Sequence, residues 1–199
     1  GMGKNAGWIF TTKATAPSAT TLTVDDDGTA DFRTLQGALN HVMQTVAAAT
    51  PVTINVNNGS YEELLYLRGK NNLTIRGESR DGVVIHYTNN NTLNAGTGGS
   101  QAIGATTLTG GRSVLLAESS DMLVIDNLTL KNTTLIGNGG QAEVIYFNSD
   151  AGRLVVSNSN FISEQDTVQV KGYSWFYRSL IAGNVDFIWG GNRVALFEE

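Results

Sequence analysis

Two aspartates lie inside apolar runs near the C-terminal end of the sequence, where the burial of a charge needs a reason. Asp166 follows Gln165 at the head of an alternating apolar segment, and Asp186 lies within the run Val-Asp-Phe-Ile-Trp at residues 185–189. A carboxylate in such a place is costly unless it is paired, hydrogen-bonded or used in chemistry. Considered alone, Asp186 also fits a turn aspartate, because a Gly-Asn pair lies just before it.

The spacing of the two aspartates favours a shared role. Positions 166 and 186 are 20 residues apart, which is close to the length of one coil in a parallel β solenoid. Neighbouring coils would stack the two carboxyl groups about 5 Å apart. Like charges at that distance separate the two pKa values and create an acid/base pair. Esterase and glycosidase chemistry both remain open, because a retaining glycosidase uses the same separation.

The segments around these aspartates resemble the pectin methylesterases. Gln165-Asp166-Thr167 is similar to the QDTLY segment of that family, and residues 183–190 are similar to its GTVDFIFG segment. Three upstream stretches resemble its QAVAL segment, its opening strand and helix, and its GxYxE turn: Gly140-Gln141-Ala142, residues 23–38 and residues 59–63. The resemblance extends over about residues 21–199.

The sequence departs from the family pattern at three places. Trp189 stands where Phe is commoner, and Val168-Gln169 stands where Leu-Tyr is usual. Glu143 opens a Glu-Val-Ile run where an apolar run is usual.

The resemblance implies a role for each site residue. Asp186 would be the nucleophile that attacks a methyl-ester carbonyl of pectin, and Asp166 would protonate the departing methanol and then activate water. Gln141 and Gln165 would donate hydrogen bonds to the oxyanion. Trp189 and Val185 are expected to bind the substrate, with the indole packed on a sugar ring.

The expected partner is therefore pectin, a methylated polygalacturonate, and we expect no cofactor, no metal and a monomeric protein. Two other functions stay open. A polygalacturonase-like glycosidase would need further inward aspartates, and a non-catalytic carbohydrate-binding β-helix would leave the Gln and Asp residues unexplained. A Ser-His-Asp hydrolase is disfavoured, because the sequence has no Gly-x-Ser-x-Gly motif and its two histidines, His41 and His86, fall in structural positions.

Short apolar segments separated by Gly and Asn predict an all-β protein, a right-handed parallel β-helix. Six of these segments recur, at residues 52–56, 73–77, 123–128, 154–158, 175–177 and 194–197. The interval of about 50 residues between the second and third is taken to span two coils. Apolar residues at helical spacing between Arg33 and Ala49 predict an α-helix that caps the N-terminal end of the solenoid. The polar, Gly-rich residues 88–112 predict a long loop along a substrate groove.

Composition narrows the remaining functions. The 199 residues carry a formal net charge of −5, which disfavours nonspecific nucleic-acid binding. With no cysteine, a disulfide framework and a thiolate metal site are excluded. Asp25-Asp26-Asp27-Gly28 lacks the further ligands of a calcium loop and is interpreted as an acidic turn. The sequence has no apolar run long enough to cross a membrane.

One domain, preceded by a linker, is assigned. Residues 1–20 are interpreted as a linker, whose strand-like start fits either the end of an immunoglobulin-like module or a strand added to the solenoid. Residues 21–199 are interpreted as a pectinesterase-like β-helix that is incomplete at its C-terminus, because the family arginine of a GRPW-like segment is expected well beyond residue 190. We therefore expect little or no esterase activity from these residues alone. The protein is expected to be secreted, extracellular or periplasmic, with its export signal removed.

Overall fold

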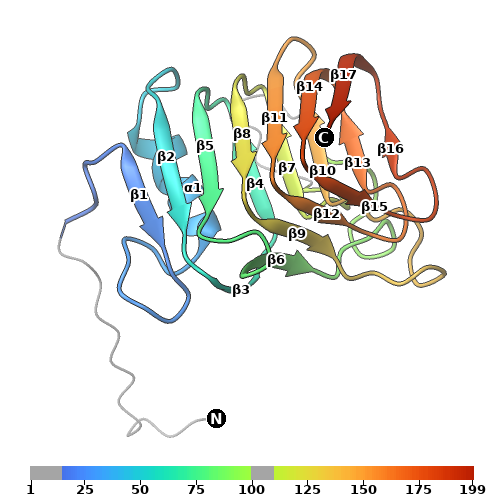
Figure 1. Ribbon diagram of the computed structural model, residues 1–199, viewed down its shortest axis with the longest axis horizontal. Coiled ribbons are helices and arrows are strands. Elements are labelled where there is room, and N and C mark those ends of the chain that lie inside the picture. The colour runs from blue at the N-terminus through green and yellow to red at the C-terminus, as the bar shows by residue number, and fades with distance from the viewer. Residues whose placement is uncertain (1–14, 100–109) are drawn as a thin grey trace, which may run out of the picture.

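The computed structural model describes residues 15–99 and 110–199, which form three parallel sheets and one helix (Figure 1). Sheet 1 has seven strands: β1 (Thr21–Val24), β2 (Val52–Val56), β5 (Leu73–Gly77), β8 (Leu123–Asp126), β11 (Arg153–Ser157), β14 (Gly172–Tyr177) and β17 (Asn192–Glu198). Sheet 2 has five: β3 (Gly59–Glu62), β6 (Val83–Tyr87), β9 (Thr129–Asn132), β12 (Asn160–Ile162) and β15 (Leu180–Ala182). Sheet 3 also has five: β4 (Leu65–Arg68), β7 (Leu115–Glu118), β10 (Ile145–Asn148), β13 (Val168–Val170) and β16 (Ile188–Trp189).

The chain passes from sheet 1 to sheet 2 to sheet 3 in each coil and then returns to sheet 1. All strand pairings within the three sheets are parallel. The protein is thus a right-handed parallel β-helix, as predicted. The six apolar segments found in the sequence are strands of sheet 1, from β2 to β17.

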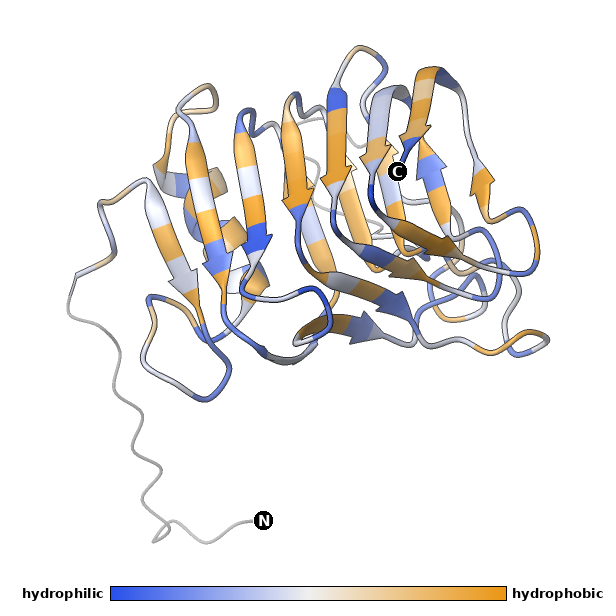
Figure 2. Ribbon diagram, in the orientation of Figure 1, coloured by the Kyte–Doolittle hydropathy of each residue, from blue (hydrophilic) through white to orange (hydrophobic). Residues whose placement is uncertain are grey.

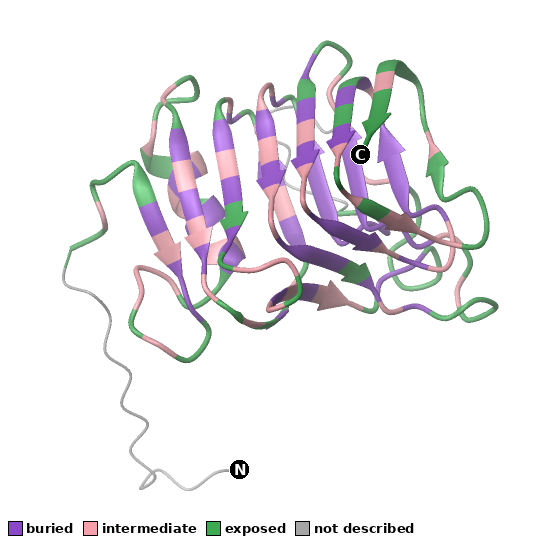
Figure 3. Ribbon diagram, viewed as in Figure 1, coloured by how far each residue is buried: buried purple, intermediate pink, exposed green. Residues whose placement is uncertain are grey.

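The core lies between the three sheets. In β2, Val52, Ile54 and Val56 are buried and the two residues between them are not, because successive side chains of a strand point to opposite faces. The same alternation of apolar and polar residues is visible along β5 (Figure 2), and it coincides with an alternation of buried residues with half-buried or exposed ones (Figure 3).

The predicted division of the 50-residue interval into two coils is wrong. β5 pairs directly with β8, with Leu73 opposite Leu123, so the interval is one enlarged coil. Its extra length lies between β6 and β7, where the long loop was predicted. A Cβ on Gly99 would lie 2.2 Å from Glu118 Oε1 and 2.8 Å from Asn148 Nδ2. The loop backbone therefore lies close against side chains of β7 and β10, although residues 100–109 are outside the described part of the chain.

The helix α1 (Leu35–Thr45) is shorter than the predicted range of Arg33 to Ala49. Thr34 caps its N-terminus, and the Glu63 carboxylate accepts from the backbone N–H groups of Leu35 and Gln36, at 2.9 Å each. The helix ends because Val46 adopts an extended conformation, with φ −109° and ψ 132°. The carbonyl groups that follow it bind the buried ammonium group of Lys70.

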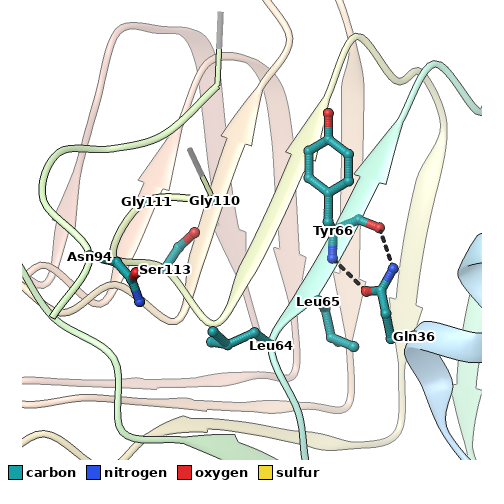
Figure 4. Close-up of a pocket in the computed structure, with 8 residues that line it drawn as sticks. All are labelled: Gln36, Leu64, Leu65, Tyr66, Asn94, Gly110, Gly111 and Ser113. Atoms are coloured by element: carbon teal, nitrogen blue, oxygen red, sulfur yellow. Dashed lines mark hydrogen bonds between the residues drawn. The ribbon is translucent and has the colours of Figure 1, made fainter. Parts of the chain in front are cut away.

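The helix closes the free edge of sheet 3, as predicted for a cap. The Gln36 amide accepts from the Tyr66 N–H at 2.7 Å and donates to the Tyr66 carbonyl at 3.2 Å (Figure 4). It thus supplies the hydrogen bonds that a neighbouring strand would give to β4. Met43 Sδ accepts from the backbone N–H of Arg68, further along β4. A pocket of about 280 Å³ lies beside this contact, and Leu64 and Ser113 are among its lining residues.

The interpretation of residues 1–20 as a linker falls largely on residues 1–14, which lie outside the described part of the chain, and it stays a prediction. Within residues 15–99 and 110–199, no helix has the length and hydropathy of a membrane span.

Candidate active site

The turn from sheet 2 to sheet 3 delivers one polar side chain from each of four successive coils. These are Arg112 before β7, Gln141 before β10, Asp166 before β13 and Asp186 before β16. The ladder that follows the turn aligns the last two coils, with Val168 opposite Ile188. Since adjacent strands are about 4.8 Å apart, the four residues form one column along the axis of the β-helix.

Asp166 and Asp186 adopt the same unusual backbone conformation. Their φ angles are 60° and 46°, in the left-handed region that few residues other than glycine adopt. A parallel bridge between Gln165 and Val185 and a hydrogen bond of 2.9 Å from Asp166 N to the Val185 carbonyl hold the turns together. Asp186 is therefore a turn aspartate and at the same time the axial neighbour of Asp166, so the two sequence interpretations do not exclude each other.

The two aspartates share a pocket of about 120 Å³ with Gln141 and Trp189. The predicted acid/base pair is thus brought together, but the two carboxylates differ in environment. Asp166 is only 3% exposed, whereas Asp186 is exposed. Burial raises the pKa of Asp166 above its ordinary value; the Arg112 guanidinium opposes this rise, and the negative charge of Asp186 adds to it. The buried carboxyl therefore holds a proton more readily than an ordinary aspartate does.

The other predicted site residues lie in different places. Trp189 lines the pocket, and its ring centroid is 5.8 Å from the guanidinium carbon of Arg112. Gln165 and Val185 form the bridge behind the two aspartates and do not line this pocket. Gln165 is half-buried, and Val185 is 39% exposed.

Two buried charged residues at this site were not predicted. Arg112 is 6% exposed, and its Nε donates to both carboxylate oxygens of the fully buried Glu143, at 2.7 and 2.8 Å. Burial raises the pKa of Glu143 to about 6, although Arg112 acts against this shift. In the sequence, Glu143 was noted only as a departure from an apolar run, and Arg112 lies in a polar, Gly-rich loop without periodicity. Neither pattern indicates a pair.

The acidic run after β1 has the structure of a turn. One carboxylate oxygen from each of Asp25, Asp26 and Asp27 lies within 4.8 Å of the others. Asp25 Oδ1 accepts from the Asp27 and Gly28 N–H groups, at 3.2 and 2.8 Å. This carboxylate closes its own turn, which fits the predicted acidic turn.

Comparisons with known proteins point to one family. The family model described as Pectinesterase matches residues 21–199. Pectinesterase 5 of Arabidopsis thaliana is 31% identical over 178 residues, which are 88% of this chain and 27% of that protein. The crystal structure of the pectin methylesterase from Aspergillus niger superposes with a TM-score of 0.70 and 26% identity, over 94% of this chain and 57% of that one. A pectin methylesterase in complex with a hexasaccharide superposes with a TM-score of 0.64 and 26% identity, over 88% of this chain and 53% of that one. The chain spans little more than half the length of these relatives, or less.

Proposed function

The chain belongs to the pectinesterase family, and we propose that its 120 Å³ pocket hydrolyses the methyl esters of pectin and releases methanol. The observation that carries this proposal is the column of two aspartates with the same backbone conformation and unequal burial. One carboxylate is open to an incoming ester, and the other favours the protonated state that a leaving alcohol needs.

The proposed reaction has two steps. In the first, the Asp186 carboxylate attacks the ester carbonyl carbon, and the bond to the methoxy oxygen breaks as Asp166 gives that oxygen a proton. Methanol leaves, and the uronate acyl group remains on Asp186 as an anhydride. In the second step Asp166 takes a proton from water, and the resulting hydroxide attacks the acyl carbon. The uronate is then released, and the Asp186 carboxylate is restored.

The negative charge that develops on the carbonyl oxygen needs hydrogen-bond donors. Gln141 lines the pocket and is the proposed first donor. Gln165 directly precedes Asp166 and is the proposed second donor. A donor of this kind contributes roughly 3 to 4 kcal/mol to the stability of a transition state. Trp189 would pack on a sugar ring of the substrate, and Val185 would contact the chain next to it.

The proposed substrate is a polysaccharide chain, in keeping with the hexasaccharide complex of the similar pectin methylesterase. A polymeric cell-wall substrate implies action outside the cytoplasm, so we propose a secreted or periplasmic protein. We also propose that it acts as a monomer, without a cofactor, nucleic acid or membrane as a partner, because each proposed role is filled by side chains of one chain.

Methanol release from methylated homogalacturonan, measured together with new reducing ends, tests the proposal. Methanol above the background of the Asp186→Asn variant, without new reducing ends, is the expected result. New reducing ends would indicate a glycosidase instead, and binding without either product would indicate a carbohydrate-binding module. The rate also tests the expectation of low activity, since turnover near an ordinary enzyme rate of about 10 s⁻¹ would contradict it.

A further inference from the structure

A buried ion pair lies directly beside the candidate active site. Arg112 and Glu143 are 6% and 0% exposed, and they come from adjacent coils, since β7 pairs with β10. A buried ion pair often contributes no more stability than apolar side chains of the same volume would. The stability of the fold therefore does not account for this pair, and its contacts with the site need a separate explanation.

The three nitrogens of the Arg112 guanidinium contact four neighbouring side chains, among them Asn91, whose Oδ1 accepts from Nη1 at 3.3 Å. Its Nε is fixed by both oxygens of Glu143. Its Nη1 donates to the Gln141 carbonyl oxygen at 2.5 Å. Its Nη2 lies 3.7 Å from Asp166 Oδ2, an oxygen that is buried and has no hydrogen-bond partner among the described residues. The planar guanidinium holds these partners in fixed directions, whereas a lysine ammonium has no such fork.

The contact with Gln141 determines which way its amide group points. A glutamine side chain offers one carbonyl acceptor and one NH₂ donor. Because Arg112 can only donate, it must take the carbonyl oxygen, and the NH₂ group is left for the pocket that Gln141 lines. Without the guanidinium, the amide could turn its oxygen to the pocket, where it would repel a developing oxyanion.

The contact between Arg112 and Asp166 changes the proton affinity of the Asp166 carboxyl. The charged groups that act on this carboxyl are Arg112, which lowers its pKa, and Asp186, which raises it. Glu143 adds a third charge nearby, since the negative charge of Asp166 contributes to the rise of the Glu143 pKa. The negative charge of Glu143 therefore partly compensates the positive charge that Arg112 places beside Asp166.

We propose that Arg112 is a positioning residue, anchored by Glu143, that turns the Gln141 amide donor to the pocket and holds a positive charge 3.7 Å from the Asp166 carboxylate. This inference rests on the proposed esterase function, because it assigns Gln141 and Asp166 the roles described there. Arg112 does not line the pocket and is not a catalytic residue.

Steady-state kinetics of methanol release separate this role from a structural one. Arg112→Met combined with Glu143→Val removes both charges, so the melting temperature should stay at or above that of the wild type. Its kcat should fall by about 100-fold through the loss of amide orientation, with KM changed by less than about twofold. Arg112→Lys keeps the charge but not the fork, so its kcat should also fall.

Arg153→Met is the matched control. Arg153 also pairs with a carboxylate, that of Asp121, but at an exposed site, and its loss should leave kcat unchanged. A double variant of Arg112 and Glu143 that folds and keeps kcat within about threefold of the wild type would overturn the inference.

Titration of the Asp166 carboxyl carbon by NMR provides a readout that does not depend on catalysis. Arg112→Met should raise the Asp166 pKa, because the positive charge that lowers it is lost, and Glu143→Gln should lower it. A wild type that releases no methanol would defeat the proposed function, and the titration would still decide the electrostatic role of Arg112. Equal Asp166 pKa values in the wild type and Arg112→Met would overturn that role.

Discussion

Asp186 repeats the backbone conformation of Asp166 one coil later, and the parallel bridge between Gln165 and Val185 holds the two turns together. The two carboxylates nevertheless differ in burial, since Asp166 is 3% exposed and Asp186 is exposed. One local structure, used twice, thus supplies two chemical environments. The predictions for the site follow from this difference.

Asp186→Asn should lower the rate of methanol release by a factor of about 10⁴ or more, because the amide cannot act as the nucleophile. The fold should persist, since the side chain is exposed and Asn tolerates a left-handed φ. Methanol release and the circular dichroism melting curve measure the two effects. Asp27→Asn, in the acidic turn after β1, serves as the control. Activity above a tenth of the wild-type value would assign the nucleophile to another residue.

Asp166→Asn should lower kcat on the methyl ester by roughly 10²- to 10⁴-fold, as expected for the loss of a general acid. Phenol leaves without the help of an acid far more readily than methanol does. The loss of the acylation rate should therefore be much smaller with a phenyl ester of the same uronate, measured as the burst of phenol. Equal losses with both esters would argue against proton donation by Asp166.

The stability of the protein should depend on the protonation of Asp166. Burial raises the pKa of this carboxyl in the folded protein, against the effect of Arg112 and with that of Asp186. Its contribution to stability is therefore complete below the ordinary pKa of aspartate, about 3.9, and is lost as the pH rises through the folded value. Urea unfolding at pH 4 and pH 7 should show a smaller decrease in Asp166→Asn than in the wild type. An equal decrease in both proteins would contradict the assigned shift.

Trp189→Ala should raise KM for methylated oligogalacturonates by about fivefold, since a lost ring contact costs about 1 kcal/mol. The effect on kcat should be smaller, because the indole binds the sugar before and during the reaction alike. Trp175→Ala is the matched control, as Trp175 is 40% exposed and lies in sheet 1. An unchanged KM in Trp189→Ala would remove this residue from the substrate site.

Lys70→Met should lower the free energy of unfolding by about 3 kcal/mol, because the carbonyl groups just after α1 would lose charge-assisted hydrogen bonds. Lys70 is 1% exposed and donates to the carbonyls of Ala47, Ala48 and Thr50 just after α1. Chemical denaturation measures the loss. Lys131→Met, at an exposed position, should change stability by less than about 0.5 kcal/mol. Equal effects of the two substitutions would exclude the proposed role of Lys70.

The sequence was sufficient to predict the strands of sheet 1 and the column of aspartates. Both predictions rest on periodic patterns in the sequence. One is the two-residue period of the buried Val52, Ile54 and Val56 in a strand, and the other is the 20-residue offset between Asp166 and Asp186. Boundaries were less predictable. The helix ends four residues before Ala49, because buried Lys70 binds the carbonyl groups that follow it, and this contact joins distant parts of the chain.

The ion pair of Arg112 and Glu143 could not be predicted in the same way. The two residues are 31 positions apart, and Arg112 ends a loop in which glycine and polar residues follow no period. The partner of a loop side chain depends on which strand follows the loop and on which strand that one pairs with. Here the pairing of β7 with β10 brings the two residues together.

The coil from Leu73 to Leu123 is 50 residues long, whereas the next two coils, measured along the same sheet, are 31 and 20. Arg112 nevertheless lies beside Gln141 and Asp166. The distance between adjacent coils is set by the hydrogen-bonded pairing of their strands, and not by the number of residues in each coil. Insertions between the ladders are therefore tolerated without loss of alignment at the catalytic column. Such a scaffold can exchange the loops that meet a polymer while its reactive groups keep their spacing, so substrate preference and chemistry can evolve separately.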